Sequence, residues 1–385
     1  MKKVLITITS IIVVLVCVGI LYSKSVIKRD VPILIEDEDN ISENMIQANI
    51  VSYNQVCEGI LYDLNEDEGK FLVTIPMQSD IQTGIETGKE YMSTNLFDED
   101  TSQMSIFNFD LTDHVSACFD SAMAGAYYIN SDANQHRKLM YTTIDNNKTI
   151  TVASEDENIT TGIVKTGNYV VYGTSDGNIK LANADGYKKL LYKLDDKYTI
   201  KKVRYFVRSQ ICVVQAENTD NEQNPLYMID TANGDIRVID INVEDFDTNE
   251  DSYSVVYISK ITDNNQIYLY DISSDTRQLE KSGELIENVF FNDQGDKVIY
   301  IERTKEGATS FNIGLIIKNG LNNIRLISDV KLANRKIILN NDNTVYYSEI
   351  RSTTEDNSKT VSTEYSVLKC IFSLEFDNNR NASIH

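Results

Sequence analysis

The sequence predicts an all-β fold: a β-propeller of eight four-stranded blades, with seven as the alternative, behind an N-terminal transmembrane helix. Three observations predict it: a strand-like segment recurs about every 43 residues, tight hairpin turns follow several copies, and an uncharged apolar stretch opens the chain. The composition agrees, because the 385 residues include 22 Tyr but only 3 Pro and no Trp. Aromatic residues with a polar tip suit β-strands, whereas proline interrupts them.

The recurring segment is a short apolar run of the Val-Val-Tyr type. Its six copies are residues 126–129, 169–172, 212–214, 254–257, 297–300 and 344–347. The spacings between their central residues are 43, 43, 42, 43 and 47. About 43 residues is the length of one propeller blade, and no sustained 3.6-residue periodicity supports helical repeats of that size. The repeat therefore predicts radially arranged antiparallel sheets.

Further strands joined by tight turns follow each copy. The clearest are residues 225–230 and 235–239, residues 266–271 with a turn at 273–275, and residues 178–181 and 189–192. Their turns include Asn233-Gly234 and Asp185-Gly186, and Asn-Gly between alternating apolar runs is a strong hairpin signal. Weaker copies at 59–73 and 105–110 bring the predicted number of blades to eight. If the short segment 83–110 is an insertion, the number is seven.

The N-terminal apolar stretch predicts a membrane anchor. Residues 4–22 carry no charge and, at ~1.5 Å per residue, span roughly 28 Å, close to the thickness of a bilayer core. Ser23-Lys24-Ser25 is only a weak cleavage site, which favours an uncleaved anchor. We expect a signal anchor at 1–29, an acidic juxtamembrane linker at 30–49, the propeller at 50–376 and a polar tail at 377–385. The predicted location is the cell membrane, single-pass, with the propeller outside the cytoplasm.

The charge and the cysteines narrow the function. With 36 Lys+Arg against 58 Asp+Glu, the net charge of −22 repels phosphate backbones, so nucleic-acid binding is not expected. Five cysteines form no Cys-x-x-Cys pair, and no zinc or thioredoxin-type motif is predicted. Cys57 and Cys370 fall in the first and last repeats, where a disulfide would clasp the ring. Buried, unpaired cysteines are the favoured alternative.

No hydrolase signature is present. The sequence contains no Gly-x-Ser-x-Gly motif, and its histidines are His114, His136 and His385. Asp113-His114, with Ser116 and Ser121 nearby, suggests a charge relay, but neighbours on a strand point to opposite faces, so a solvated loop histidine is favoured. His136 is interpreted in the same way. We therefore predict no catalytic residue.

Metal and nucleotide sites are not predicted either. The acidic segment 244–251 begins like a calcium loop, but Glu250 stands where the turn needs glycine, and Val256 where a bidentate Glu is needed. A solvated inter-strand loop is expected instead. Gly84 and Gly88 lack the spacing of a phosphate-binding loop. No metal ligand and no cofactor-binding residue is predicted, and no cofactor.

One blade carries a family resemblance. Residues 289–301, with the turn Asn292-Asp293-Gln294-Gly295, resemble the WD-repeat-like blade of TolB-like and dipeptidyl-peptidase-type propellers. A looser copy lies at 336–346. The resemblance implies the propeller fold over about residues 50–375 and no functional residue. In TolB-like relatives the propeller is a protein dock.

These observations lead to a functional hypothesis. We expect a membrane-anchored extracytoplasmic propeller that acts as a protein-binding or scaffold module of the bacterial cell envelope, with the membrane and another envelope protein as partners. The alternative is a small-ligand-binding or hydrolytic enzyme that uses the central channel. A channel lined by several acids with a metal or histidine would favour the alternative. A plugged channel beside an exposed apolar patch would favour protein binding. Whether the protein is an enzyme stays open, with a non-enzymatic role favoured.

Overall fold

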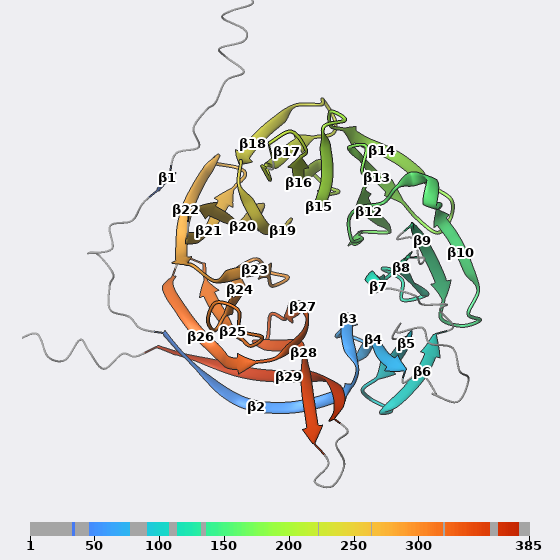
Figure 1. Cartoon of the computed structure of the whole chain (residues 1–385), viewed down its shortest axis with the longest axis vertical. Helices are drawn as coiled ribbons and strands as arrows, with labels where there is room; N and C mark the ends of the chain where they lie inside the picture. Colours follow the sequence, from blue (N-terminus) through green and yellow to red (C-terminus); the bar gives the residue numbers. More distant parts are fainter. Residues whose placement is uncertain are drawn as a thin grey trace, which may run out of the picture.

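The described chain forms a ring of seven β-sheets around a central axis (Figure 1). The computed structural model describes residues 33–34, 46–77, 91–107, 114–131, 136–221, 223–262, 264–318, 320–354 and 361–376. Within each sheet, four strands pair antiparallel with their neighbours, from an innermost strand near the axis outward to the rim. We number the sheets as blades 1 to 7 in chain order.

The first four blades follow one another without interruption. Blade 1 contains β3 (Ile60–Asn65), β4 (Lys70–Met77), β5 (Tyr91–Asp98) and β6 (Gln103–Phe107). Blade 2 contains β7 (His114–Phe119), β8 (Gly125–Ser131), β9 (Arg137–Thr143) and β10 (Thr149–Ala153). A 3-10 helix, η3 (Glu155–Glu157), leads to blade 3, with β11 (Val164–Thr166), β12 (Tyr169–Gly173), β13 (Asn178–Ala182) and β14 (Lys188–Lys193). Blade 4 contains β15 (Tyr198–Phe206), β16 (Ile211–Asn218), β17 (Leu226–Asp230) and β18 (Ile236–Asp240).

The last three blades include strands from both ends of the chain. Blade 5 contains β19 (Val243–Asn249), β20 (Ser254–Ile261), β21 (Asn264–Asp271) and β22 (Thr276–Gly283), and β1 (Ile33–Leu34) pairs parallel with β22. Blade 6 contains β23 (Ile286–Phe291), β24 (Lys297–Arg303), β25 (Phe311–Ile317) and β26 (Gly320–Val330). Blade 7 contains β27 (Leu332–Leu339), β28 (Thr344–Thr354), β29 (Val361–Phe376) and β2 (Ile46–Glu58).

The prediction of eight blades is wrong, and the alternative of seven is confirmed. The segment 105–110 was expected to begin a new hairpin, but it contains the end of β6, the fourth strand of blade 1. The strands β5 and β6 complete the blade that β3 begins. Hairpin signals mark strand pairs rather than whole blades, so one long blade was counted as two.

The repeated Val-Val-Tyr segments are the second strands of blades 2 to 7. They lie in β8, β12, β16, β20, β24 and β28. A second strand has a neighbour on each side in its sheet and a blade against each face, so it consists of a continuous apolar run. In β16, seven of the eight residues are buried. The predicted turn glycines Gly186 and Gly234 adopt φ of +89° and +82°, the left-handed conformation that tight hairpins use.

Seven hydrophobic clusters fill the seven interfaces between adjacent blades. Between blades 3 and 4, for example, Val171 and Ile179 pack in the same cluster as Ile200 and Val214. Gly173 on β12 faces Ile200 so closely that a Cβ there would overlap the isoleucine side chain. The core of the protein is therefore divided among blade interfaces that form a closed ring.

The ring is closed by strand pairing between the two ends of the propeller. The strand β2 pairs antiparallel with β29, so Tyr53 lies opposite Cys370 and Cys57 lies opposite Val367. The hydroxyl of Tyr53 is 2.6 Å from that of Tyr347 on β28. Both Cys57 and Cys370 are buried free thiols in blade 7, as the alternative to a disulfide anticipated. Cys57 and Cys370 do not lie opposite each other in this strand pair, so no disulfide joins them. The backbone pairing of β2 with β29 closes the ring instead.

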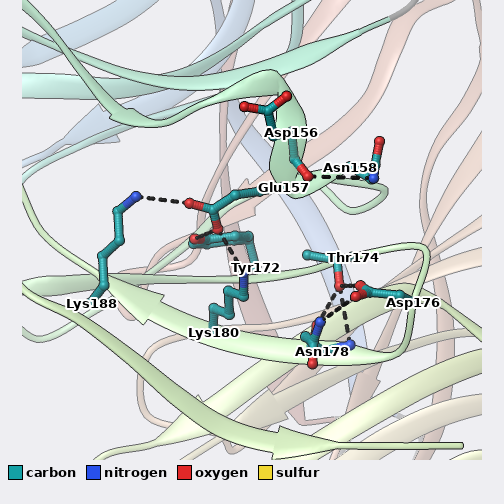
Figure 2. A network of polar contacts seen from close by, with 9 residues as sticks. All are labelled: Asp156, Glu157, Asn158, Tyr172, Thr174, Asp176, Asn178, Lys180 and Lys188. Atoms are coloured by element: carbon teal, nitrogen blue, oxygen red, sulfur yellow. Dashed lines mark hydrogen bonds and ion pairs between the residues drawn. The ribbon is translucent and has the colours of Figure 1, made fainter. Parts of the chain in front are cut away.

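One carboxylate joins the helix η3 to three strands of blade 3 (Figure 2). Glu157 accepts hydrogen bonds from Tyr172 Oη at 2.7 Å, Lys180 Nζ at 2.9 Å and Lys188 Nζ at 2.8 Å. Burial opposes ionisation, but the bonds from Lys188, Tyr172 and Lys180 outweigh it and lower the pKa of Glu157 to about 2. Nearby, Asp176 accepts hydrogen bonds from Thr174 and Asn178 and closes the turn between β12 and β13.

In the part of the chain that the structure describes, no helix is long and apolar enough to cross a membrane. The predicted span at 4–22 and the tail at 377–385 lie outside the described residues. The anchor therefore stays a prediction.

Candidate functional site: the central channel

The innermost strands surround a cavity of about 630 Å³ on the axis of the ring. Its wall is built mainly from β3, β7, β11, β15, β23 and β27. The strands β3, β7, β15, β23 and β27 lie around the centre of the ring in Figure 1. The charged residues that line it are Asp63, Lys165, Lys201, Lys202, Arg204, Arg335 and Lys336. The cavity therefore matches neither of the two channels anticipated from the sequence, because it is open and its charged side chains are mostly cationic.

Hydrogen bonds between side chains and backbone fix the register of neighbouring innermost strands. Asp245 accepts a bond from the backbone N–H of Val289 at 3.2 Å, and Asp247, two residues later, accepts one from Phe291 at 3.0 Å. The strands β19 and β23 therefore run in the same direction. Between blades 3 and 4, Thr166 Oγ1 donates to the carbonyl of Tyr205 at 2.8 Å. Such bonds replace a backbone ladder between blades and fix the channel wall.

Two cations of the wall are paired with carboxylates from the next blade. Lys202 Nζ on β15 lies 2.6 Å from Asp245 Oδ1 on β19, and Arg204 Nε lies 3.0 Å from Asp247 Oδ1. Burial raises the pKa of Asp247, but Arg204 and Lys202 outweigh that effect and hold it below its usual value. Burial lowers the pKa of Lys202, and Asp245 opposes that shift. The four side chains join blades 4 and 5, and the two carboxylates extend the connection to the backbone of blade 6.

This arrangement corrects the expectation for the acidic segment 244–251. The segment is not a solvated loop, because most of it forms β19, the innermost strand of blade 5. The side chain of Asp245 is buried and that of Asp247 is largely buried, whereas Glu250 and Asp251 follow the strand and pair with Arg208. Within the described residues, no group of three or more His, Cys, Asp or Glu side chains is arranged to hold a metal ion.

Two other cations of the wall have no carboxylate partner among the described residues. They are Lys165 on β11 and Lys336 on β27, and both side chains are exposed to the channel. By contrast, Lys201 pairs with Glu217 at 2.5 Å and Arg335 pairs with Glu287 at 3.2 Å. Burial and the negative charge of Asp63 raise the pKa of the Cys118 thiol on β7, and the positive charges of Lys165 and Lys336 oppose that rise. The two lysines and Asp63 therefore act on the same part of the wall.

The structure does not show the suggested charge relay among the described residues, and its serines make other hydrogen bonds. Ser116 Oγ accepts a hydrogen bond from the backbone N–H of Ile163 at 3.2 Å, and Ser121 Oγ donates to Asn168 Oδ1 at 2.6 Å, so both serines connect blades 2 and 3. His114 begins β7 rather than lying in a loop. His136 is exposed and precedes β9, as expected. Asp113 and His385 lie outside the described residues.

The cationic wall was not predicted from the sequence, although a signal for part of it was present. Lys202 and Asp245 are 43 residues apart, as are Arg204 and Asp247. That separation equals the repeat, so residues one repeat apart occupy equivalent positions on adjacent blades. Opposite charges at this spacing on first strands predict inter-blade ion pairs. The positions of Lys165 and Lys336 carry no comparable signal.

Comparisons with known proteins agree with the fold. No protein-family model and no curated protein matches the chain. Among solved structures, an oligogalacturonate lyase in complex with manganese aligns with a TM-score of 0.55 and 9% identity, covering 86% of this chain and 98% of its own. An oligogalacturonate lyase from Vibrio parahaemolyticus gives a TM-score of 0.56 and 10% identity, with 84% and 98% covered.

A third similar structure is the β-propeller domain of Myceliophteria thermophila Cps50 (Swd1), with a TM-score of 0.50, 9% identity and coverage of 82% and 99%. Similarity at such low identity shows the fold alone. Together with the seven sheets, it defines the chain as a seven-bladed β-propeller. The relationship to TolB-like or dipeptidyl-peptidase-type propellers stays a prediction.

Proposed function

We propose that this protein is a binding module whose central channel takes an anionic ligand. The observation that carries the proposal is the charge of the channel wall. Six Lys or Arg side chains and one Asp line the cavity, although the whole chain has a net charge of −22. A cationic cavity in an acidic protein concentrates positive potential at one place, because the surrounding low-dielectric walls focus the field.

The chemistry of the wall supports binding of such a ligand. Lysine and arginine side chains donate hydrogen bonds to carboxylate, sulfate or phosphate oxygens. The carboxylate of Asp63 accepts a hydrogen bond from the backbone N–H of Phe119 at 2.9 Å, which ties it to the neighbouring blade. A cavity of about 630 Å³ is within the range of small-molecule sites. The walls are held by inter-blade bonds, so a ligand meets a site that is already formed.

Ligand titration of the full-length chain in detergent solution tests the proposal. The first probe is oligogalacturonate, because two structures of similar fold are lyases named for this acidic oligosaccharide. A neutral oligosaccharide of the same length is the comparison. We expect the acidic probe alone to bind, with an affinity that falls as salt rises. Inorganic phosphate serves as a second anionic probe.

A charge-reversal variant locates the binding. Replacing both channel lysines, Lys165→Glu with Lys336→Glu, should weaken anion binding at least tenfold. The control is Lys189→Glu, which reverses the charge of an exposed lysine on the outermost strand β14. This variant should bind anions as the unmodified protein does. Equal affinity in the channel variant and the control would contradict the proposal.

We also propose that residues 4–22 anchor the propeller in the cell membrane, outside the cytoplasm, beside another envelope protein. The uncharged apolar stretch supports this placement. Crosslinking of the tagged chain in intact cells, followed by capture and mass spectrometry, tests the partner. The control is a tagged chain of residues 1–49 alone. A partner captured with the full chain and absent from the control supports docking by the propeller, whereas equal capture by both contradicts it.

A further inference from the structure

The channel wall keeps more positive than negative charge when its ion pairs are taken into account. Its cations are Lys165, Lys201, Lys202, Arg204, Arg335 and Lys336. Four of them are paired, Lys201 with Glu217, Lys202 with Asp245, Arg204 with Asp247 and Arg335 with Glu287. Among the described residues that line the cavity, this leaves Lys165 and Lys336 without an ion-pair partner and Asp63 as the one carboxylate.

The two unpaired cations of the wall, Lys165 and Lys336, come from different parts of the ring. Lys165 is on β11 of blade 3 and Lys336 is on β27 of blade 7, so blades 1 and 2 separate them on one side of the ring and blades 4 to 6 on the other. A ligand on the axis is therefore approached from two sides. Both lysines are long, flexible donors that no carboxylate of the described residues holds in place.

The paired cations of the wall are less suited to the ligand. Lys202 and Arg204 are engaged by Asp245 and Asp247, which also accept backbone hydrogen bonds from blade 6. A ligand that took either cation would leave a carboxylate without its cation, which is unfavourable in a low-dielectric site. Arg335 is positioned over the Phe311 ring, 3.8 Å from its centroid, and is held by Glu287.

From this charge distribution we infer that the channel selects a group with two negative charges, a phosphate monoester or a pair of carboxylates, over a singly charged group. The two charges are neutralised by Lys165 and Lys336 from opposite parts of the ring. This inference rests on the proposed function, since it specifies which anion the same cavity prefers. Its physical basis is that binding a dianion leaves neither lysine uncompensated, whereas a monoanion leaves one.

Calorimetric titration of the full-length chain in detergent with matched probes tests the inference. Methyl phosphate and methyl sulfate have similar shapes, but at pH 7.5 the phosphate carries close to two charges, since its second pKa is about 6. Malonate and acetate form a second pair. We expect the dianion of each pair to bind at least tenfold more tightly. Lowering the pH to 5 should weaken methyl phosphate binding and leave methyl sulfate binding unchanged.

Single variants assign the preference. In Lys165→Gln or Lys336→Gln, the ratio of dianion to monoanion affinity should fall to near one, while Lys189→Gln should keep the ratio of the unmodified protein. A dianion preference in the phosphate pair alone would restrict the ligand to phosphate monoesters, and a preference in both pairs would extend it to dicarboxylates.

Three outcomes separate this inference from the proposed function. Equal binding of the dianion and monoanion in both pairs overturns the inference and leaves anion binding intact. Binding of oligogalacturonate without any binding of the small probes also overturns the inference and leaves anion binding intact. Failure of every anion to bind overturns the proposed function and the inference together.

Discussion

Arg204 on β15 and Asp247 on β19 form an ion pair between adjacent blades, with Nε and Oδ1 3.0 Å apart. The second oxygen of Asp247 accepts the backbone N–H of Phe291 in the following blade. One carboxylate thus connects three innermost strands and neutralises one cation of the channel. The stability of the ring and the charge of its cavity depend on the same side chain, so a substitution there changes both.

Asp247→Asn should change stability and anion binding in opposite directions. Removing the charge leaves Arg204 without its partner, and breaking a buried pair typically costs about 3 kcal/mol of unfolding free energy. The same change makes the channel more positive, so anion affinity should rise by roughly tenfold at low salt. Urea denaturation and calorimetric titration measure the two effects.

The exposed Asp145, in the turn between β9 and β10, provides the control for this prediction. Asp145→Asn changes the net charge by the same amount but should alter neither quantity measurably. Weaker anion binding in Asp247→Asn would argue against a ligand that occupies the channel.

Glu157→Gln should destabilise blade 3 by about 1 to 2 kcal/mol at pH 7, because it removes a charged acceptor shared by Tyr172, Lys180 and Lys188. The bonds that lower the pKa of Glu157 from 4.5 to about 2 contribute stability that is fully present above pH 4.5. This contribution is lost as the pH falls toward 2. The difference between the unmodified protein and the variant should therefore shrink as the pH is lowered from 5 to 3.

Denaturation at several pH values checks this prediction. Glu155→Gln is the control, since Glu155 forms an exposed pair with Lys138 and its loss should matter little. A difference between the unmodified protein and Glu157→Gln that is independent of pH would show that the carboxylate charge is not the cause.

Tyr53→Cys should allow the disulfide that the native cysteines do not form. Tyr53 lies opposite Cys370 in the β2–β29 pair, so the new thiol would face the native one across the closure of the ring. Closing so long a loop should raise the unfolding free energy by about 2 to 4 kcal/mol in the absence of reductant. Thermal unfolding with and without dithiothreitol measures the gain. Asn54→Cys, opposite Lys369, should show no such dependence.

Gly173→Ala should lower stability by about 1 to 3 kcal/mol, because the added methyl group overlaps Ile200 at the interface of blades 3 and 4. In a chain that carries Ile200→Ala, which removes the Cγ2 atom nearest to the added methyl group, Gly173→Ala should cost less than it does in the unmodified chain. Urea denaturation of both variants checks this. Single losses that simply add in the double variant would show that the two side chains are not in contact.

Much of the architecture is determined by the sequence itself. The runs at 169–172 and 254–257 predict buried strands because a continuous apolar run of this length needs cover on both faces, and they form β12 and β20. Asn233-Gly234 predicts a hairpin because glycine reaches positive φ without strain, and β17 and β18 flank it. These signals are local, since they depend on neighbours along the chain.

The number of blades, the closure and the charge of the channel were decided only by the tertiary structure. Segment 105–110 looks like the start of a hairpin, and only its pairing with β5 shows that it ends blade 1. The pairing of Tyr53 with Cys370 joins residues more than 300 positions apart, which no local pattern specifies. Lys165 and Lys336 reach one cavity because seven sheets converge on a single axis. Local periodicity determines which face of each strand is buried, whereas the ring determines which distant strands share a wall.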